Sequence, residues 1–451
     1  MNKLFNPKSV AVVGASRYKA KVGYGVIKNL VKGGYFKSKF NKPFKGRVYP
    51  VNPHATSILG LRCYKSLAGI RGEVDLAVIA VQASLVPRIM DECLKKKVKA
   101  VIVISAGFAE LGEKGKELQQ QIADKARGKI TLVGPNCLGV IHPSSGLNAS
   151  FAPAMPPSGN VAFISQSGAL ADSVIDWAIS SGYGFSKLIS YGNAALVGIN
   201  DLVEYFSKDK ETKAIAIYLE GLKDGRRFMR AAKGCKKPII VLKAGKTEHG
   251  MKAIGSHTGS LAGSYEVYMA AFRQCGVKAA ETLEELFSFA DVLASQPRLK
   301  KNSVAIITNG GGCGVLCADY CESEGLKLAK LSEKMLKKID RKMHPAYSRS
   351  NPLDLVGDAL PERYGAAINA VLGEKNVSGA IVIQTLQTMT DTVKDAQIVV
   401  KAKNKFKKPV LAVFLGGKLT EPGVELLKKN NVPCYAELKD AARAMRVLLS
   451  L

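Results

Sequence analysis

The sequence predicts an α/β fold made of three consecutive doubly wound domains. Short runs of β-branched residues alternate with amphipathic stretches along the chain, the rhythm of parallel strands joined by crossover helices. At 451 residues the chain is long enough for about three domains of ~150 residues each. With 47% hydrophobic and 23% charged residues, its composition is that of a folded globular protein rather than a disordered one.

Five strands are expected in the first domain, each ending in small or polar residues. They are predicted at Ser9–Val13, Arg47–Val51, Val74–Val81, Ala100–Ile104 and Ile130–Val133. The following stretch, Pro143–Gly159, is rich in Pro, Gly and Ser and is interpreted as a linker.

The same pattern continues beyond this linker. Strands of the second domain are expected near Asn160–Ile164, Lys187–Ser190, Ala214–Leu219 and Pro238–Leu242, followed by a helix at Leu283–Ser295. Gln296-Pro297-Arg298 forms a natural break. Strands of the third domain are expected near Ser303–Thr308, Gly379–Ile383 and Pro409–Phe414, with a closing helix at Leu438–Leu449.

Charge and cysteine content restrict the class of protein. The net charge is +29, but the lysines are spread from Lys3 to Lys439 without a long basic block. This favours a solvated surface or polyanionic small molecules over a nucleic-acid groove. Nine scattered cysteines, an odd number, indicate free thiols in a reducing compartment. Met1–Gly14 leads directly into a strand without a leader, and no apolar run approaches ~20 residues, so we expect a cytoplasmic protein with no membrane partner.

Small and polar residues gather where the predicted strands end. They are Gly14-Ala15-Ser16, Gln82-Ala83-Ser84, Ser105-Ala106-Gly107, Gly134-Pro135-Asn136, Ser165-Gln166-Ser167-Gly168, Glu220-Gly221 and Asn309-Gly310-Gly311-Gly312. Ligands bind at the carboxyl ends of strands in open α/β sheets, and small residues let backbone N–H groups approach an anion there.

The first of these turns is not a dinucleotide fingerprint. Only the first glycine of G-x-G-x-x-G is present, at Gly14, and the second strand ends in Asn52-Pro53 without an acidic residue. A nicotinamide cofactor, and therefore a dehydrogenase, is disfavoured. A nucleotide with an extra phosphate, flanked by Lys19 and Lys21, is easier to accommodate. A tight turn without a ligand remains the alternative.

Three other motifs lack a required part. Gly245-Lys246-Thr247 has Ile240 where a P-loop needs its first glycine, and the turn at Ser165–Gly168 lacks the leading glycine of a nucleophile elbow. Cys313, Cys317 and Cys321 lie on one helical face with no second ligand segment, so we interpret them as buried apolar residues. No metal site is expected.

His257 is the candidate nucleophile. It is one of five histidines and lies in Ile254–Ser264, a Gly/Ser/Thr-rich segment that we expect to form a flexible loop. A neutral imidazole can accept a phosphoryl group, and helix N-termini can stabilise the resulting charge. Glu220 is the candidate carboxylate to orient the imidazole; the alternative is an ordinary surface acid.

The ordered set of motifs resembles a known family. The set comprises Val13–Ser16, Val51-Asn52-Pro53, Ser105–Phe108, Gly134–Val140, Ser165–Gly168 and Gly255–Ser260. Together they resemble the nucleoside-diphosphate-forming acyl-CoA synthetases, relatives of succinyl-CoA synthetase, over essentially the whole chain.

The resemblance implies a fold and a domain order. Residues 1–145 are similar to a Rossmann-like CoA-binding domain, 146–296 to a flavodoxin-like phosphohistidine domain, and 297–451 to a flavodoxin-like ligase domain. The arrangement is like an α subunit of the ADP-forming acetyl-CoA synthetases. Relatives specific for succinate have an arginine-bearing serine turn where this chain has Ser165–Gly168, which favours a smaller or less charged acid.

The resemblance also implies roles for individual residues. CoA would be bound by Gly14, Ser16, Lys21, Asn52, Pro53, Gln82 and Ser105, with Asn136 and Cys137 near its thiol. His257 would become the phosphohistidine, positioned by Glu220. Phosphate would be bound by Ser165, Ser167 and Gly168, aided by a helix of the third domain that begins either at Gly310, Gly311 and Gly312 or after Gln384-Thr385.

A partner chain completes the implied enzyme. No nucleotide-grasp domain is expected in this sequence, so ADP or ATP with Mg²⁺ would bind to an ATP-grasp β subunit, in an α2β2 heterotetramer. The small-molecule substrates would be acyl-CoA, phosphate and ADP. Two alternatives remain: a ligase for succinate or another acid, and a non-catalytic CoA-binding scaffold. No nucleic-acid partner is expected.

Overall fold

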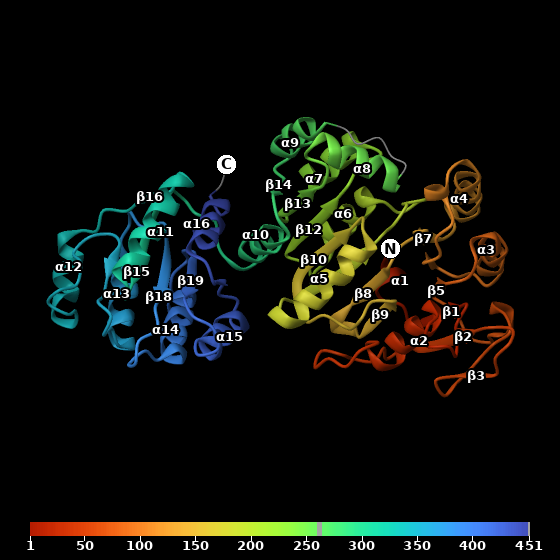
Figure 1. Ribbon diagram of the computed structural model, residues 1–451, viewed down its shortest axis with the longest axis horizontal. Coiled ribbons are helices and arrows are strands. Elements are labelled where there is room, and N and C mark those ends of the chain that lie inside the picture. The colour runs from red at the N-terminus through yellow and green to blue at the C-terminus, as the bar shows by residue number, and fades with distance from the viewer. Residues whose placement is uncertain (259–263, 450–451) are drawn as a thin grey trace. The chain divides into compact units, whose positions relative to one another are not determined.

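The computed structural model describes residues 1–258 and 264–449, except for the side chains of residues 255–258. The chain forms two compact units, Met1–Leu286 and Phe287–Leu451. Parallel sheets flanked by helices make up both units (Figure 1), so the predicted α/β class is confirmed.

The first sheet contains the five predicted strands in the order β2-β1-β5-β6-β7, all parallel. Their bounds are β1 (Ser9–Val13), β2 (Arg47–Val51), β5 (Leu76–Ile79), β6 (Ala100–Val103) and β7 (Thr131–Val133). Helices α1 (Asn2–Phe5), α2 (Val22–Lys32), α3 (Val86–Lys95) and α4 (Glu113–Ala126) and a short hairpin, β3 (Ser57–Ile58) and β4 (Leu61–Arg62), complete this part. The strand order changes direction between β1 and β5, which is where such sheets bind ligands.

The second sheet repeats this topology and adds two strands. Its order is β14-β13-β12-β10-β11-β8-β9. The bounds are β8 (Gly139–His142), β9 (Leu147–Ser150), β10 (Ser158–Ser165), β11 (Phe185–Ser190), β12 (Ala214–Leu219), β13 (Ile239–Lys243) and β14 (Lys278–Ala280). Its helices are α5 (Gly168–Ser181), α6 (Ile199–Lys208), α7 (Gly225–Gly234), α8 (Glu248–Thr258) and α9 (Tyr265–Gln274). The next helix, α10 (Leu283–Ser295), was expected to close this domain, but most of it belongs to the C-terminal unit, which begins at Phe287.

The expected linker at Pro143–Gly159 is wrong. β8 and β9 pair antiparallel and extend the second sheet beside β11, and every residue of β9 is buried. Asn29 of α2 donates its Nδ2 to the carbonyls of Ser150 and Ala152, each at 2.9 Å. The segment is rich in loop-forming residues, yet the strand pairings and the Asn29 hydrogen bonds satisfy its backbone polar groups. They also hold α2 against the second sheet.

One hydrophobic core joins the two sheets of the N-terminal unit. It includes Phe5 of α1, Val12 of β1, Ile164 of β10 and Phe206 of α6, all fully buried. The rings of Phe5 and Tyr205 stack with centroids 4.8 Å apart. The first 286 residues are therefore packed as a single body.

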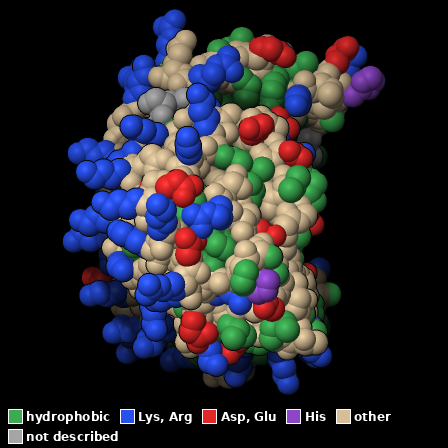
Figure 2. Space-filling view, turned by 90° about the vertical axis from the view of Figure 1, so that its left-hand side faces the viewer, with side chains coloured by type: hydrophobic (Ala, Val, Ile, Leu, Met, Phe, Trp, Pro, Cys, Tyr) green, Lys and Arg blue, Asp and Glu red, His purple; other side chains and the backbone are tan. Residues whose placement is uncertain are grey.

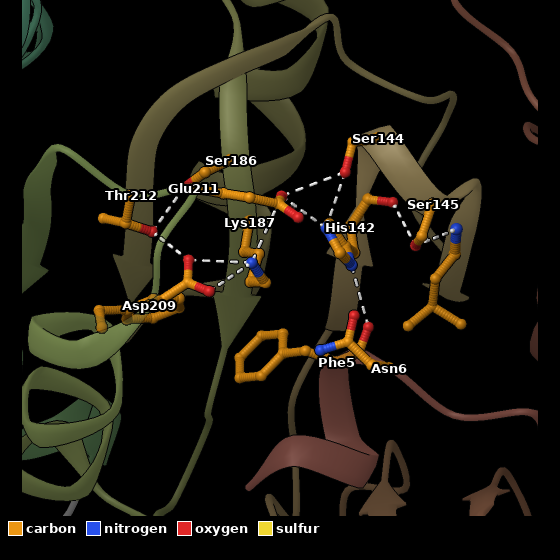
Figure 3. Close-up of polar contacts among 12 residues, drawn as sticks. Phe5, Asn6, His142, Ser144, Ser145, Ser186, Lys187, Asp209, Glu211 and Thr212 are labelled. Atoms are coloured by element: carbon orange, nitrogen blue, oxygen red, sulfur yellow. Dashed lines mark hydrogen bonds and ion pairs between the residues drawn. The ribbon is translucent and has the colours of Figure 1, made fainter.

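A buried polar cluster reinforces this joint (Figure 3), with Lys187 of β11 at its centre. The Lys187 side chain is 1% exposed, and its Nζ donates to both carboxylate oxygens of Asp209 at 2.9 Å. Burial opposes ionisation of Asp209, but hydrogen bonds from Thr212 and Lys187 and the charge of Lys187 hold its pKa below the usual value. His142 of β8 donates Nδ1–H to the Phe5 carbonyl at 3.0 Å, and its Nε2 lies 2.8 Å from Glu211.

The third sheet forms the C-terminal unit with the order β16-β15-β18-β19-β20, and β17 pairs with the end of β15. The bounds are β15 (Ser303–Thr308), β16 (Lys327–Leu328), β17 (Leu353–Asp354), β18 (Gly379–Gln384), β19 (Val410–Phe414) and β20 (Cys434–Tyr435). Its helices are α11 (Gly311–Ser323), α12 (Glu333–Ile339), α13 (Pro361–Gly373), α14 (Thr392–Lys405), α15 (Glu421–Lys429) and α16 (Leu438–Val447). Cys317 and Cys321 are buried on α11 as expected, whereas Cys313 is only half-buried.

Lysine and arginine side chains, dispersed in the sequence, gather on one side of the face shown in Figure 2. All nine cysteines are free thiols. In the part of the chain that the structure describes, we find no helix long and apolar enough to cross a bilayer.

The Lys187 cluster predicts a large loss of stability when its ammonium is removed. Lys187→Met should lower the free energy of unfolding of the N-terminal unit by about 3–5 kcal/mol, because the Asp209 carboxylate, 12% exposed, then loses its direct ion-pair partner. Urea denaturation followed by circular dichroism measures this change.

Two further variants separate lost charge from lost packing. Lys210→Met, at an exposed neighbouring lysine, should leave the free energy of unfolding within about 0.5 kcal/mol of the wild type. Adding Asp209→Asn to Lys187→Met should recover part of the loss. A Lys187→Met protein as stable as the Lys210→Met protein contradicts this account of the cluster.

Candidate functional site

A cavity of about 1250 Å³ lies in the N-terminal unit, where the carboxyl ends of the first and second sheets face each other. Its walls come from the turns after β5 and β6, the loop Asn136–Leu138, the start of α5, and the segments 191–201 and 221–227. Loops that the sequence predicted as ligand-binding at the ends of two separate sheets therefore share one cavity.

The turns of the first sheet lie side by side at its carboxyl edge. Gly14 N–H donates to the Val51 carbonyl at 3.1 Å, and Asn52 donates its Nδ2 to the Ala15 carbonyl at 2.7 Å. Gly14 has φ +89°, and a Cβ there would lie 2.3 Å from the Ala80 carbonyl oxygen. Only glycine fits this turn, which brings the ends of β1, β2 and β5 together.

Three of the nine predicted CoA-binding residues line the cavity itself: Ser105, Asn136 and Cys137. Ser105 Oγ donates to the Val81 carbonyl at 2.5 Å and accepts from Val81 N–H at 3.2 Å, so it fixes the turn after β5. The Cys137 thiol points to the Val103 carbonyl at 3.3 Å, and burial raises its pKa to about 12. Cys137 is consequently an unreactive thiol.

The other six lie outside the cavity lining, in the turns after β1, β2 and β5 and at the start of α2. Ser16 is buried and its Oγ accepts from Tyr18 N–H at 3.0 Å, whereas Lys21 is exposed and precedes α2. Pro53 and Gln82 are exposed. These positions leave polar and charged groups available to an elongated ligand that extends from the cavity over the carboxyl edge of the sheet.

The turn before α5 has an internal scaffold. Buried Ser165 donates its Oγ to the Ser167 carbonyl at 2.6 Å, and Ser167 caps the helix by accepting from Leu170 N–H at 3.3 Å. Helix geometry leaves the N–H groups of Gly168 and Ala169 without intrahelical acceptors, and both residues line the cavity. The start of α5 therefore presents N–H donors and a positive dipole end to an anion.

Gln166 joins this turn to Glu220. Its Oε1 accepts from the N–H groups of Glu220 and Gly221 at 2.8 and 3.1 Å. Glu220 is 5% exposed, so it is not the ordinary surface acid of the alternative interpretation. Burial and then the charge of Glu220 raise the pKa of Tyr191, and Tyr191, Gln166 and Gly221 all line the cavity.

His257 belongs to the last turn of α8, so the expected loop at Ile254–Ser264 is wrong for residues 254–258. The His257 side chain and residues 259–263 lie outside the described residues. The Gly/Ser/Thr-rich composition of the segment did not reveal that the backbone of residues 248–258 is helical.

Gly310, Gly311 and Gly312 lie in the C-terminal unit at the start of α11. Gly310 N–H donates to Thr308 Oγ1 at 3.0 Å. Buried Asn309 accepts from Thr385 N–H at 2.7 Å and donates to the Thr385 carbonyl at 2.9 Å. Both predicted phosphate-binding alternatives, the start of α11 and the end of β18, therefore meet at one point of the third sheet.

Asn193 is a cavity residue that the sequence did not reveal. Its Nδ2 donates to Glu110 at 2.5 Å and to Gln119 at 3.0 Å, and its Oδ1 accepts from Asn136 at 3.3 Å. Burial opposes ionisation of Glu110, but the Asn193 hydrogen bond and backbone N–H groups hold its pKa below the usual value. Asn193 thus ties the cavity wall of the second sheet to the first, through contacts distant in sequence.

Charged residues of the cavity were also missed. Arg227 donates to Asp201 at 2.6 Å, and Lys223 donates to the carbonyls of Asn193 and Ala194, each at 3.0 Å. Asp172 of α5 has a partly buried carboxyl whose pKa is raised to about 6 by burial. Each of them is an isolated charge in the sequence, which gave no signal for a shared cavity.

Three family models match successive parts of the chain. They are a CoA binding domain at residues 8–143, a succinyl-CoA ligase like flavodoxin domain at 158–293 and a ligase-CoA domain at 304–447. The acetate–CoA ligase (ADP-forming) II subunit alpha of Pyrococcus furiosus is 43% identical, and the match covers 100% of this chain and 97% of that subunit. The chain belongs to the ADP-forming acetate–CoA ligase family.

Further members of the ADP-forming acetate–CoA ligase family agree with this assignment and with the fold and enzyme class predicted by the sequence. Acetate–CoA ligase (ADP-forming) I of Archaeoglobus fulgidus is 42% identical over 99% of this chain, but the chain spans 63% of its length. The acetyl-coenzyme A synthetase 1 of Candidatus Korarchaeum cryptofilum, solved with phosphate and ADP, is 36% identical with a TM-score of 0.90. That match covers 99% of this chain and 96% of the other.

The Asn193 contacts predict a specific loss of stability at the cavity wall. Asn193→Ala should lower the free energy of unfolding of the N-terminal unit by about 1.5–3 kcal/mol, because the partly buried Glu110 carboxylate loses a charge-assisted hydrogen bond. Gln120→Ala is the matched control, since exposed Gln120 lines the same cavity but, among the described residues, its side chain hydrogen-bonds only to Asp124. Equal free energies of unfolding for the two variants would remove Asn193 from this role.

Proposed function

We propose that this chain is the α subunit of an ADP-forming acyl-CoA synthetase that acts on acetate or a similarly small monocarboxylic acid. The observation that carries the proposal is the single cavity that joins the carboxyl edge of the first sheet to the start of α5 and to the neighbourhood of Glu220. The names of the relatives support the same activity. The reaction converts acyl-CoA, phosphate and ADP to the free acid, CoA and ATP.

CoA binds along the carboxyl edge of the first sheet in this proposal. Gly14, Ser16, Lys21, Asn52-Pro53, Gln82 and Ser105 contact it, and its thiol lies near Asn136 and Cys137. The turns outside the cavity would bind the nucleotide end of CoA. Ser105 and Asn136 line the cavity, where the thioester would be placed.

Phosphate binds at the start of α5 and attacks the thioester. A phosphate oxygen forms a bond to the acyl carbon, the C–S bond breaks, and CoA leaves as the thiolate, giving an acyl phosphate. The N–H groups of Gly168 and Ala169 and the dipole of α5 stabilise the phosphate charge, and Ser165 and Ser167 hold the turn in shape. Positioning of the reactants supplies most of the remaining rate enhancement.

His257 then takes the phosphoryl group. An imidazole nitrogen forms a bond to phosphorus, the P–O bond to the acyl group breaks, and the carboxylate leaves. Glu220 orients the imidazole by accepting a hydrogen bond from its other nitrogen; its burial beside Gln166 and the α5 turn supports this assignment. The phosphoryl group finally passes to the terminal phosphate oxygen of ADP.

A partner subunit supplies the nucleotide site. We infer an ATP-grasp β subunit that holds ADP with Mg²⁺, an α2β2 assembly, and a cytoplasmic location. The domains 1–145, 146–296 and 297–451 would bind CoA, carry the phosphohistidine and support phosphoryl transfer, respectively. The start of α11 at Gly310–Gly312, or the adjoining Gln384-Thr385, would stabilise the phosphohistidine.

The first half-reaction can be tested on this chain without its partner. Incubation with acetyl-CoA and labelled orthophosphate, in the absence of nucleotide, should release CoA and leave an acid-labile, base-stable label on His257. His257→Ala should abolish the label while CoA affinity, measured by calorimetry, stays within about threefold, because the imidazole is the nucleophile and does not bind CoA.

His249→Ala is the matched control for this experiment. His249 is exposed on the same helix, so its removal should leave labelling unchanged. CoA binding without labelling in the wild-type protein would support the non-catalytic CoA-binding scaffold instead. Label retained in the His257→Ala protein would exclude His257 as the nucleophile.

Glu220→Gln should slow the labelling of His257 by roughly 10²-fold at unchanged CoA affinity, because a carboxamide orients and stabilises the imidazole less well than a carboxylate. Rapid-quench measurement of the labelling rate checks this value. Glu284→Gln, at an exposed acid of the same unit, should label at the wild-type rate. A Glu220→Gln rate equal to that of Glu284→Gln would assign Glu220 no part in the transfer.

A further inference from the structure

A lysine is buried beside Glu220 at the carboxyl edge of the second sheet. Lys243 ends β13 and pairs in register with Leu219 of β12, the residue before Glu220. Lys243 is 5% exposed. We propose that Lys243 is a positioning residue for phosphoryl transfer, whose ammonium keeps the Glu220 carboxylate ionised and available to the imidazole of His257. This inference rests on the proposed function and adds a residue to it.

The contacts of Lys243 hold its ammonium at this edge without neutralising it. Nζ donates to the carbonyl of Ala244 and lies 4.6 Å from the centre of the Tyr268 ring on α9. The Tyr268 hydroxyl accepts from Leu222 N–H at 3.0 Å, so the same side chain contacts the segment that follows Glu220. Among the described residues, Lys243 forms no ion pair, and a carbonyl and an aromatic face leave its positive charge intact.

The charge of Glu220 acts on three titratable side chains of the second sheet. Burial lowers the pKa of Lys243, and the charge of Glu220 opposes this shift. Burial and then the same charge raise the pKa of Tyr191 and of Tyr218. Both phenols are therefore neutral at physiological pH, and Lys243 is the cation among these neighbours of Glu220. Opposite charges in a partly desolvated site favour each other's ionised forms more strongly than they do in water.

The turn after Lys243 supports the helix that carries His257. Gly245 has φ +79°, and a Cβ there would lie 2.5 Å from Cδ1 of Ile254 on α8. This close approach packs α8 directly against the chain that leaves β13. The backbone that carries Lys243 and the helix that carries His257 are therefore in contact.

The proposed transfer requires an ionised carboxylate at Glu220. When the imidazole attacks phosphorus, its ring becomes positively charged, and a carboxylate stabilises that charge better than a neutral acid does. Burial favours the neutral form of a carboxylic acid, and the negative charge of a nearby phosphoryl group favours it further. The ammonium of Lys243 offsets both effects and does so without contacting the reacting atoms.

The pH dependence of labelling tests the proposal on this chain without a partner subunit. Acetyl-CoA and labelled orthophosphate are mixed with the protein between about pH 5.5 and 8.5, and rapid quench gives the rate of His257 labelling. Lys243→Met removes the cation that favours the ionised carboxylate, so labelling should require a pH about one unit higher. The rate should fall about 10-fold on the acid side of the profile and return to within about threefold of the wild type on the alkaline side. Lys246→Met, at an exposed lysine of the next turn, should keep the wild-type profile.

A double variant shows whether Lys243 acts through Glu220. The Glu220→Gln protein has no carboxylate to keep ionised, so adding Lys243→Met to it should change the labelling rate by less than about twofold. Lys243→Arg retains the charge and should restore the wild-type pH dependence. Lys243→Leu provides a second neutral variant for the same comparison if Lys243→Met does not fold.

The readouts separate failure of this inference from failure of the proposed function. If the wild-type protein binds CoA but is not labelled, the proposed function is wrong. If it is labelled but the Lys243→Met and Lys246→Met profiles coincide, Lys243 has no part in the transfer. An equal loss at every pH, or a loss that multiplies with that of Glu220→Gln, would assign Lys243 to packing and overturn the proposal.

Discussion

The antiparallel pair β8–β9 is the constraint on which the site depends. The chain leaves the first sheet after β7 and returns through β8 along the edge of the second sheet, where β8 pairs with β11. β9 then lies against α2, and Asn29 binds the backbone that follows it. These contacts, with the shared core and the Lys187 cluster, make one body of two parallel sheets and let their carboxyl ends open into one cavity.

This joint explains how the turns of two sheets come to line one cavity. A doubly wound sheet alone offers ligand-binding turns at its own switch point. Here the turns after β5 and β6 face the start of α5 across the Asn136–Leu138 loop, and Asn193 bridges the two walls. A thioester held by one sheet can therefore meet an anion held by the other without a large movement of either.

The sequence predicted the parts of the fold that local patterns encode. Strands such as Ser9–Val13 and Ala214–Leu219 have the predicted bounds, because β-branched runs bounded by turn residues are a local signal. The predictions of a linker at Pro143–Gly159 and of a loop around His257 were wrong, because the structure of these segments is not set by local sequence patterns. β9 is stabilised by partners in α2 and β8, and the helical state of residues 254–258 overrides their glycine content.

The residues of the site likewise divide into those that a local pattern reveals and those that only the folded structure reveals. Gly14 and Ser167 could be found because a turn or a cap requires those residue types at the end of a strand or the start of a helix. Asn193 and Lys223 could not, because their importance comes from a cavity formed by segments far apart in the chain. An asparagine or lysine in isolation carries no such information, and only the packing of the two sheets gives it a role.

A crystal structure of the chain with phosphate and a non-hydrolysable thioether analogue of acetyl-CoA tests most directly whether one cavity brings the thioester and the phosphate together. We expect the thioether sulfur to lie beside the Asn136–Leu138 loop and phosphate to accept hydrogen bonds from the N–H groups of Gly168 and Ala169. An analogue bound with its acyl end away from α5, or phosphate bound outside this cavity, would contradict the account.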